Sequence, residues 1–313
     1  MQLIRGLHNL KAMQSIFEQG CVLTIGNFDG IHLGHQQILK QVAADAKAVG
    51  LPSVVMLFEP LPIEFFAPEK APVRLMNLRE KLEAFGQTQV DYVLLCRFDQ
   101  SFAEMSAQAF VEQLLITLLN VKQLVVGDDF RFAKNREGSF QTLVKSGKTY
   151  GFSVDDMSTL LMDGERISST RIRQALAEHD LALVQRLLGG AFYFKGRVIH
   201  GKRLGRELGF RTLNLNPKRM QMPVEGVYTV YVSGLAEQDW PGVANIGVRP
   251  TIDGLRPSIE VHLFNWSQEV YGRHVGIKLD QFIRSEMAFD SLDELKAQIT
   301  LDVAQARKLL RLV

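Results

Sequence analysis

The sequence is poor in cysteine: Cys21 and Cys96 are the only two among 313 residues. Two cysteines cannot form a disulfide framework or, by themselves, a metal site, so we expect reduced thiols. The chain also lacks any run of about 18 apolar residues, the length needed for a membrane-spanning helix. Its N-terminus alternates polar and apolar residues without the apolar core of a signal peptide. These absences predict a protein that stays in the cytoplasm.

A strong charge of either sign is missing as well. The net charge is +2 and the pI is near 8.5, which does not by itself argue for a nucleic-acid partner. Hydrophobic residues make up 46% and charged residues 22%, as in soluble globular proteins. A length of 313 residues is comfortable for two domains of roughly 100–200 residues each.

Short apolar runs alternate with longer amphipathic segments up to about residue 188. The predicted strands are Cys21–Ile25, Ser53–Phe58, Tyr92–Cys96 and Leu124–Val126. The predicted helices are Gln36–Val49, Leu78–Phe85, Ala107–Leu119, Gly138–Tyr150, Ser169–Glu178 and a short segment over 179–188. This alternation predicts βα units and a parallel sheet. We therefore predict an α/β domain at residues 1–188, ended by Gly189 and Gly190.

Beyond Gly190 the pattern changes to short strand-like runs separated by Gly, Pro and Asn turns. These runs are Phe192–His200, Gly226–Val232, Gly242–Ile246, Ser258–Asn265 and Val275–Ile283. They favour an antiparallel barrel or sandwich. The segment Ser291–Leu310 carries Leu292, Leu295, Ile299, Val303 and Leu309 at the spacing of one amphipathic helix. We therefore predict an all-β domain with a terminal helix at residues 189–313.

The most informative stretch follows the first predicted strand. Gly26 and Gly30 flank a polar turn, and His32 and His35 stand at the start of the next helical pattern. Glycines let the backbone approach a ligand, and a helix N-terminus offers N–H groups and a positive dipole end to an anion. Two imidazoles three residues apart could face one bound phosphate. An ordinary loop, a metal pair or surface polar groups remain alternatives.

A second segment places Ser168, Ser169 and Thr170 directly before a helical pattern that contains Arg171 and Arg173. Hydroxyl side chains at this position are good N-caps, so a capped helix with surface arginines explains the composition alone. We expect this segment and the Gly26 turn each to lie at a strand-to-helix turn, which would put both at the carboxyl edge of one parallel sheet. A third segment, Lys195–Arg219, holds eight Lys or Arg residues and one acid, Glu207, among several glycines. Such a loop can wrap polyphosphate, follow a nucleic-acid backbone, or form only a solvated hairpin.

Together these stretches resemble one family. Residues 26–35, GNFDGIHLGH, are similar to the His-x-Gly-His signature of nucleotidylyltransferases, in the form typical of bacterial bifunctional riboflavin kinase/FMN adenylyltransferases, or FAD synthetases. Residues 167–173 resemble the family's ISSTxxR motif, and residues 196–210 resemble the GxVxHGxxxGxxxGF loop of its kinase module. The resemblance implies a Rossmann-like nucleotidylyltransferase domain with a parallel sheet, followed by an antiparallel β-barrel with a terminal helix.

For the first domain, the resemblance implies attack of the FMN phosphate on the α-phosphorus of ATP. It implies that His32, His35 and Arg173, with Mg²⁺, neutralise the developing negative charge. The implied ATP contacts are Gly26, Asn27, Phe28, Asp29, Gly34, Ser168, Ser169 and Thr170. The implied flavin contacts are Phe58, Pro60, Pro62, Asp128, Asp129 and Phe130. Leu61 and Ala133 stand where the family often has a polar residue and a glycine.

For the second domain, the resemblance implies that Glu260 accepts the proton of the ribityl hydroxyl as it attacks the γ-phosphate of ATP. The implied ATP contacts are Gly201, Lys202, Gly205, Gly209 and Thr212. Thr212 and Asn214 are the implied Mg²⁺ ligands, and Arg284 and Phe289 border the flavin. Arg211 and Leu213 replace a proline and a small residue of the family pattern. An adenylyltransferase with a kinase-inactive barrel therefore stays open as an alternative.

Two other interpretations are weaker. A class I aminoacyl-tRNA synthetase also uses a His-x-Gly-His turn, but residues 167–173 lack its lysine-centred loop. An RNA-binding barrel would explain the basic segment but would not need Thr212, Asn214 and Glu260. We therefore predict a bifunctional enzyme that uses riboflavin, FMN and ATP with Mg²⁺, without a nucleic-acid or membrane partner. The sequence leaves its oligomeric state open.

Overall fold

The computed structural model describes residues 1–157, 159–200, 209–251 and 254–312. Two compact units make up the chain. The first comprises Met1–Pro72 and Lys81–Ile167, and the second comprises Val73–Glu80 and Ser168–Val313. The predicted domain limit between residues 188 and 189 stays a prediction, because packing alone does not test which segment folds by itself.

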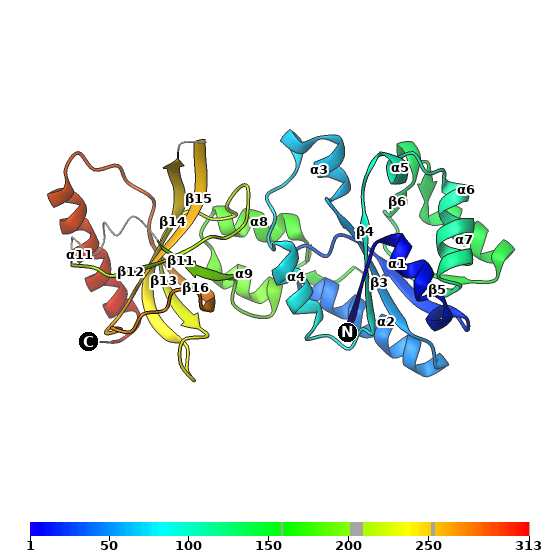
Figure 1. Cartoon of the computed structure of the whole chain (residues 1–313), viewed down its shortest axis with the longest axis horizontal. Coiled ribbons are helices and arrows are strands. Elements are labelled where there is room, and N and C mark those ends of the chain that lie inside the picture. Colours follow the sequence, from blue (N-terminus) through cyan, green and yellow to red (C-terminus); the bar gives the residue numbers. More distant parts are fainter. Residues whose placement is uncertain (158, 201–208, 252–253, 313) are drawn as a thin grey trace. The chain divides into compact units, whose positions relative to one another are not determined.

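A six-stranded parallel sheet forms the centre of the first unit, with the strand order β1-β4-β3-β2-β5-β8 (Figure 1). Its strands are β1 (Gln2–Arg5), β2 (Cys21–Ile25), β3 (Ser53–Glu59), β4 (Tyr92–Arg97), β5 (Val121–Val126) and β8 (Ser153–Asp156). All five residues of β2 are buried, as expected for a strand that is covered on both faces. The predicted α/β class with a parallel sheet is confirmed.

Helices cover both faces of this sheet. They are α1 (Gly6–Ala12), α2 (Leu33–Val49), α3 (Pro62–Phe66), α4 (Leu78–Phe85), α5 (Gln100–Ala103), α6 (Ala107–Ala109) and α7 (Phe140–Tyr150), with short turns η1 (Gln14–Phe17), η2 (Pro68–Lys70) and η4 (Lys134–Arg136). The single helix predicted over 107–119 is instead α6 followed by a π-helical segment, η3 (Phe110–Leu118). One face packs on α1, η3 and α7 through a continuous apolar core, whereas α2 contacts β2 and β3.

Three predicted ligand segments follow three neighbouring strands. The Gly26 turn follows β2, the Pro60 segment follows β3, and Gly127–Phe130 follow β5. Because β2 pairs in parallel with both β3 and β5, these segments meet at the carboxyl edge of one sheet. The chain order reverses between β2 and β5, which is where ligands bind in open α/β sheets.

The second predicted motif does not follow a strand of this sheet, and that expectation was wrong. Ser168 comes after β10 (Glu165–Arg166), which pairs only with β9 (Leu161–Met162) in a two-stranded antiparallel ribbon. A similar small ribbon joins β6 (Arg131–Phe132) to β7 (Gly138–Ser139). The predicted helix start at Gly138 is accordingly displaced, because Ser139 caps α7 and the helix begins at Phe140.

A closed barrel with the strand order β11-β12-β15-β14-β13-β16 forms the second unit (Figure 1). Its strands are β11 (Tyr193–Ile199), β12 (Thr212–Leu215), β13 (Gly226–Ser233), β14 (Trp240–Thr251), β15 (Gly254–Leu263) and β16 (His274–Arg284). Every neighbouring pair is antiparallel. The predicted barrel is confirmed, and it includes β12, which the sequence pattern did not indicate.

The terminal helix α11 (Leu292–Leu309) lies along this barrel, as Figure 1 shows in red. Val303, Ala306 and Leu310 join Val227 and Phe264 in one apolar cluster. Arg284, at the end of β16, donates two hydrogen bonds to the buried Asp302 carboxylate of α11, at 2.9 and 2.7 Å. Leu292 was predicted to pack on the barrel but is 56% exposed, so the buried stripe of α11 is shorter than the sequence pattern predicted.

Helices α8 (Ser169–Ala177) and α9 (Leu181–Leu188) belong to the same compact unit as the barrel. His179, in the turn between them, stacks on Phe282 of β16 with ring centroids 3.7 Å apart. The His179 Nδ1 and the Tyr228 hydroxyl lie 2.7 Å apart. These contacts fix the end of α8 against the barrel.

A buried ion pair joins Val73–Glu80 to the barrel within this unit. The side chains of Glu80 and Arg219 are 1% and 2% exposed. Glu80 also accepts the Lys195 N–H of β11 at 2.8 Å, and Arg219 donates to the carbonyl oxygens of Arg74 and Leu75. Asn77 and Glu80 form a reciprocal capping box at the start of α4.

Removing one member of this pair is expected to destabilise the chain. Arg219→Met leaves the Glu80 carboxylate buried without its cation, which typically costs about 3–5 kcal/mol. The neighbouring exposed Lys218→Met is the matched control, expected to change stability by no more than about 0.5 kcal/mol. Urea unfolding measures both. Equal stability of the two variants would show that the ion pair does not hold this segment.

Candidate active sites

The turn after β2 has a left-handed backbone at three positions. Gly30, Phe28 and Ile31 have φ of 88°, 47° and 40°. A Cβ at Gly26 would lie 2.9 Å from the Phe28 ring, so only glycine permits this close approach. Phe28 and Asp29 are buried, while Asn27 is exposed. The glycine, aromatic and carboxylate residues of the predicted phosphate-binding turn therefore lie together in one compact turn.

His32 is the N-cap of α2. Its Nδ1 accepts the backbone N–H of His35 at 3.3 Å, so in the neutral ring the proton resides on Nε2. The His32 and His35 rings stack with centroids 3.7 Å apart and planes 16° apart. Glycine at position 34 leaves room for the His32 ring at the start of α2, since a Cβ there would lie 3.2 Å from His32 Nδ1. The capping bond thus assigns His32 Nε2–H as a donor at a helix N-terminus.

Both imidazoles favour the neutral form. The pKa of His32 is lowered to about 4, mainly by burial and also by the charge of Arg166, while the charge of Asp29 opposes the shift. Burial is also the main cause that lowers the pKa of His35, helped by the charges of His32, Lys81 and Arg166. The His35 Nδ1 is buried and has no hydrogen-bond partner among the described residues. A negatively charged ligand beside these rings would reduce the penalty for protonating them.

These pKa values predict a pH dependence of stability. Unfolded histidine titrates near pH 6.5, so between there and about pH 4 the unfolded chain binds a proton at position 32 that the folded chain does not. The free energy of unfolding therefore falls as pH decreases through this window, by about 3 kcal/mol at about 1.4 kcal/mol per pH unit. His32→Asn should flatten this dependence relative to the wild-type chain, as measured by urea unfolding at several pH values.

Two cations near the turn were not singled out by the sequence. Arg166, at the end of β10, lies close enough to lower the pKa of both histidines, and its Nη1 is 3.4 Å from the Asp129 Oδ2. Lys81, in α4, is buried and donates to the Asn27 carbonyl oxygen at 2.7 Å. The Asn77–Glu80 spacing could have indicated a capping box at the start of α4, but no local pattern indicates where Lys81 points.

Aromatic side chains dominate the predicted flavin segments of the first unit. Phe58 lies at the end of β3 and contacts Phe98 and Phe102 edge-on, with centroids 5.8 and 5.3 Å away. Pro60 follows a cis peptide bond and Pro62 begins α3. After β5, Phe130 stacks on Phe132, while Asp128 and Asp129 are exposed. The two segments offer apolar ring faces and carboxylates at the carboxyl ends of β3 and β5, the two strands that flank β2.

The second motif begins α8 in the other unit. Ser168 is its N-cap and accepts the Arg171 N–H at 3.2 Å, which confirms the capping interpretation of this serine. Ser169 and Thr170 are the first two residues of the helix. The Arg173 Nε donates to the Val73 carbonyl oxygen at 2.6 Å. The catalytic and ATP-binding roles of these residues stay predictions.

The predicted kinase residues share one face of the barrel wall. Thr212 pairs with His262, and Asn214 pairs with Glu260, across β12 and β15. Asn245 of β14 stands opposite Glu260 on the other side. Because side chains alternate along a strand, Thr212, Asn214 and Glu260 project to the same face. The barrel therefore brings the predicted metal ligands and the predicted base together.

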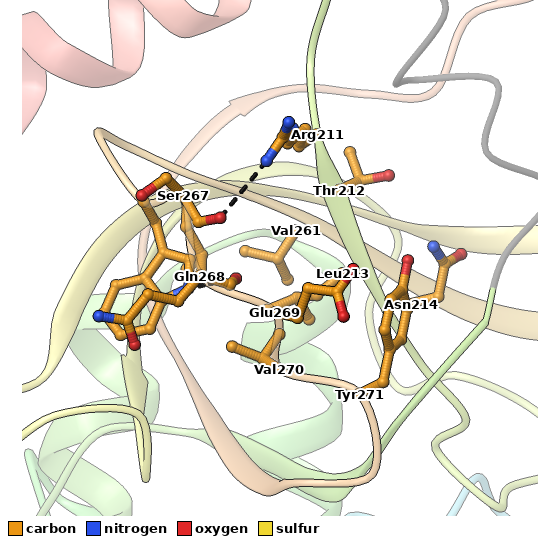
Figure 2. Close-up of a pocket in the computed structure, with 12 residues that line it drawn as sticks. Arg211, Thr212, Leu213, Asn214, Val261, Ser267, Gln268, Glu269, Val270 and Tyr271 are labelled. Carbon is orange, nitrogen blue, oxygen red and sulfur yellow. Dashed lines mark hydrogen bonds between the residues drawn. The ribbon is translucent and has the colours of Figure 1, made fainter.

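A cavity of about 110 Å³ lies beside β12 (Figure 2). It is lined by Arg211–Asn214, by Val261 and Leu263 of β15, and by the segment Trp266–Tyr271. The guanidinium of Arg211 donates to the Ser267 carbonyl oxygen at 3.3 Å, the dashed contact in Figure 2. Leu213 is buried on the opposite side of the strand from Thr212 and Asn214. These two departures from the family pattern leave the β12 ladder regular.

The remaining predicted kinase contacts differ in their surroundings. Arg284 binds Asp302, and its guanidinium lies 6.0 Å from the ring of Phe289, so its first role is to hold α11. Gly209 has φ of 90°. Gly201, Lys202 and Gly205 lie outside the described residues. The roles of these six residues in ligand binding stay predictions.

Known proteins are similar to this chain over nearly its whole length. The FAD synthetase family model matches residues 14–171, and the Riboflavin kinase model matches residues 188–310. The bifunctional riboflavin kinase/FMN adenylyltransferase of Escherichia coli K12 is 52% identical over 308 residues, covering 98% of this chain and 97% of the relative. This chain belongs to the bifunctional riboflavin kinase/FMN adenylyltransferase family.

A second curated relative and one solved structure are also similar to this chain. The bifunctional riboflavin kinase/FMN adenylyltransferase of Haemophilus influenzae is 48% identical over 307 residues, with 98% of each chain covered. The crystal structure of the macrolide-efflux protein from Streptococcus pneumoniae matches with a TM-score of 0.78 at 30% identity, covering 98% of this chain and 99% of that one.

Among the described residues, no helix is both long and apolar enough to cross a membrane.

Proposed function

We propose that this chain makes FAD from riboflavin in two steps, each at its own site. The second unit phosphorylates riboflavin to FMN, and a site that includes the β2 turn adenylylates FMN. The observation that carries the proposal is the His32–His35 pair at the N-terminus of α2, where His32 Nε2–H is available as a donor. The two matching family models, in the same order along the chain, support it.

In the adenylyl transfer, a phosphate oxygen of FMN forms a bond to the α-phosphorus of ATP. The bond from that phosphorus to the bridging oxygen breaks, and pyrophosphate leaves with its electron pair. Both substrates are anions, so catalysis depends on positioning and on donors aimed at the developing charge. His32 Nε2–H, the N–H groups of α2 and the cation Arg166 serve this purpose. The family resemblance implies the same role for Arg173. The aromatic residues after β3 and β5 hold the flavin.

In the kinase step, Glu260 accepts the proton of the ribityl 5′-hydroxyl while its oxygen bonds to the γ-phosphorus, and ADP leaves. Thr212 and Asn214 offer neutral oxygens beside Glu260, a donor set that suits a hard cation already bound to phosphates. Mg²⁺ held there would neutralise charge on the ATP phosphates. No group of three His, Cys, Asp or Glu residues that could hold a metal occurs among the described residues.

The kinase-inactive alternative rested on Arg211 and Leu213, and the regular pairing of Thr212–Leu215 with β15 argues against it. Riboflavin, FMN and ATP are the substrates in this proposal, and the enzyme works in the cytoplasm without a nucleic-acid or membrane partner.

Position-specific labelling of ATP tests the proposal. With riboflavin as the acceptor, label in the γ-phosphate is expected in FMN and in FAD, whereas label in the α-phosphate is expected in FAD alone. Absence of γ-label from FMN would reject the kinase assignment. Absence of α-label from FAD would reject the adenylyltransferase assignment.

A further inference from the structure

Lys81 is a buried cation directly beneath the ATP-binding turn. Lys81 is 2% exposed, and its Nζ donates a hydrogen bond to the Asn27 carbonyl oxygen at 2.7 Å. Lysine is almost never fully buried unless it is paired, because removing the ammonium group from water is costly. A buried lysine is therefore expected where its hydrogen bonds hold a segment of backbone in one conformation.

The same helix contacts the turn a second time. Phe85, one helical turn after Lys81, packs edge-on against the Phe28 ring with centroids 5.7 Å apart. Phe28 in turn lies 4.9 Å from the ring of His35, which stacks on His32. One continuous series of contacts therefore runs from α4 through the turn to both imidazoles.

These two contacts act on a strained peptide. The Asn27 carbonyl belongs to the peptide group that precedes Phe28. The hydrogen bond from Lys81 therefore fixes the orientation of that peptide group, and the contact with Phe85 fixes the position of the Phe28 ring. Phe28 and Ile31 both have positive φ, which costs about 1–3 kcal/mol each for residues other than glycine. Such a backbone persists only where its surroundings determine it from several directions.

We propose that Lys81 is a positioning residue for adenylyl transfer, one that holds the Asn27–Phe28 peptide and thereby sets the placement of His35 and His32. The inference rests on the proposed adenylyltransferase function of the turn. Lys81 does not touch the reacting atoms. Its effect passes through the backbone carbonyl and the aromatic contacts, and misplacement of a catalytic group by about 1 Å can lower a rate about 10²-fold.

The test compares Lys81→Met with the exposed Lys47→Met, in the last turn of α2. Lys81→Met is expected to lower kcat for FAD formation from added FMN at least 10-fold, with a smaller change in the KM for ATP. Phosphorylation of riboflavin by the same protein should stay at the wild-type rate, which reports that the second unit is folded. Lys47→Met should leave both activities unchanged, and Lys81→Arg should recover part of the loss.

A histidine titration distinguishes positioning from general loss of structure. The charges of Lys81, His32 and Arg166 all lower the pKa of His35, so Lys81→Met should raise that pKa in an NMR titration and shift the imidazole resonances. If Lys81→Met lowers stability, Phe85→Leu tests the same contact path from the other side and should also slow FAD formation selectively. Wild-type FAD kinetics in both folded variants would overturn the inference. A wild-type chain that makes no FAD would instead refute the proposed function.

Discussion

Replacing His32 by asparagine is expected to lower FAD formation from FMN about 10²–10³-fold, the usual cost of losing one donor to a developing oxyanion. Asparagine keeps an N-cap acceptor for the His35 N–H but supplies no equivalent of His32 Nε2–H. The fold should therefore persist while the chemical step slows. Steady-state rates of FAD formation, with FMN and ATP saturating, measure the effect.

His32→Ala is the companion variant. It removes the donor and the cap together, so it should slow FAD formation as much as His32→Asn and also lose about 1 kcal/mol of stability. Both variants should phosphorylate riboflavin normally, because the kinase residues lie in the barrel. If His32→Asn formed FAD at the wild-type rate, His32 would not be a catalytic donor and the assignment of the β2 turn would fail.

Glu260→Gln is expected to have the complementary effect. It keeps the size of the side chain opposite Asn214 but removes the carboxylate that accepts the ribityl proton, so riboflavin phosphorylation should fall about 10²–10⁴-fold. Adenylylation of added FMN should be unchanged. High-performance separation of FMN and FAD follows both activities in one assay.

The control for Glu260→Gln lies on the neighbouring strand. Asn245 stands opposite Glu260 but is not assigned to the proton transfer, so the neutral substitution Asn245→Ser should keep most kinase activity. A normal kinase rate in Glu260→Gln would show that another group, or no general base, removes the proton. An equal loss in both variants would indicate that this face tolerates no change at either position, which would contradict a specific role of Glu260 as the base.

The central strands and the order of the two domains could be predicted because they depend on local apolar patterns. β2 is a five-residue run buried on both faces, and its prediction was correct to the residue. β8 and β12 were missed because neither strand has a clear local apolar pattern. β8 is an edge strand with the polar sequence SVDD, and β12 has only four residues that follow a basic segment. Their pairing partners, which lie far away in the sequence, determine that they become strands.

The candidate sites divide in the same way. Residues in compact motifs, such as His32 and His35, could be found from spacing and from the family resemblance. Lys81 and Arg166 could not, because their importance comes from where a helix and a small antiparallel ribbon place their charges. A lysine in the sequence REK is typical of a solvated helix face. Only the folded structure turns it toward the Asn27 carbonyl.

The assignment of Ser168–Arg173 needed a similar correction. A hydroxyl-rich helix start was expected after a strand of the parallel sheet, but the segment follows β10 and its helix packs with the barrel. Capping by Ser168 could be predicted, since it depends on the residues of one helical turn. The unit to which the helix belongs depends on tertiary contacts such as the His179–Phe282 stack.

Flavin product analysis of the wild-type chain tests the two-site account most directly. The chain would be incubated with riboflavin, ATP and Mg²⁺, and separately with FMN, ATP and Mg²⁺. The account predicts FMN and FAD from riboflavin, and FAD from FMN. FAD from added FMN alone would contradict the kinase site, and neither flavin product from either substrate would contradict both sites.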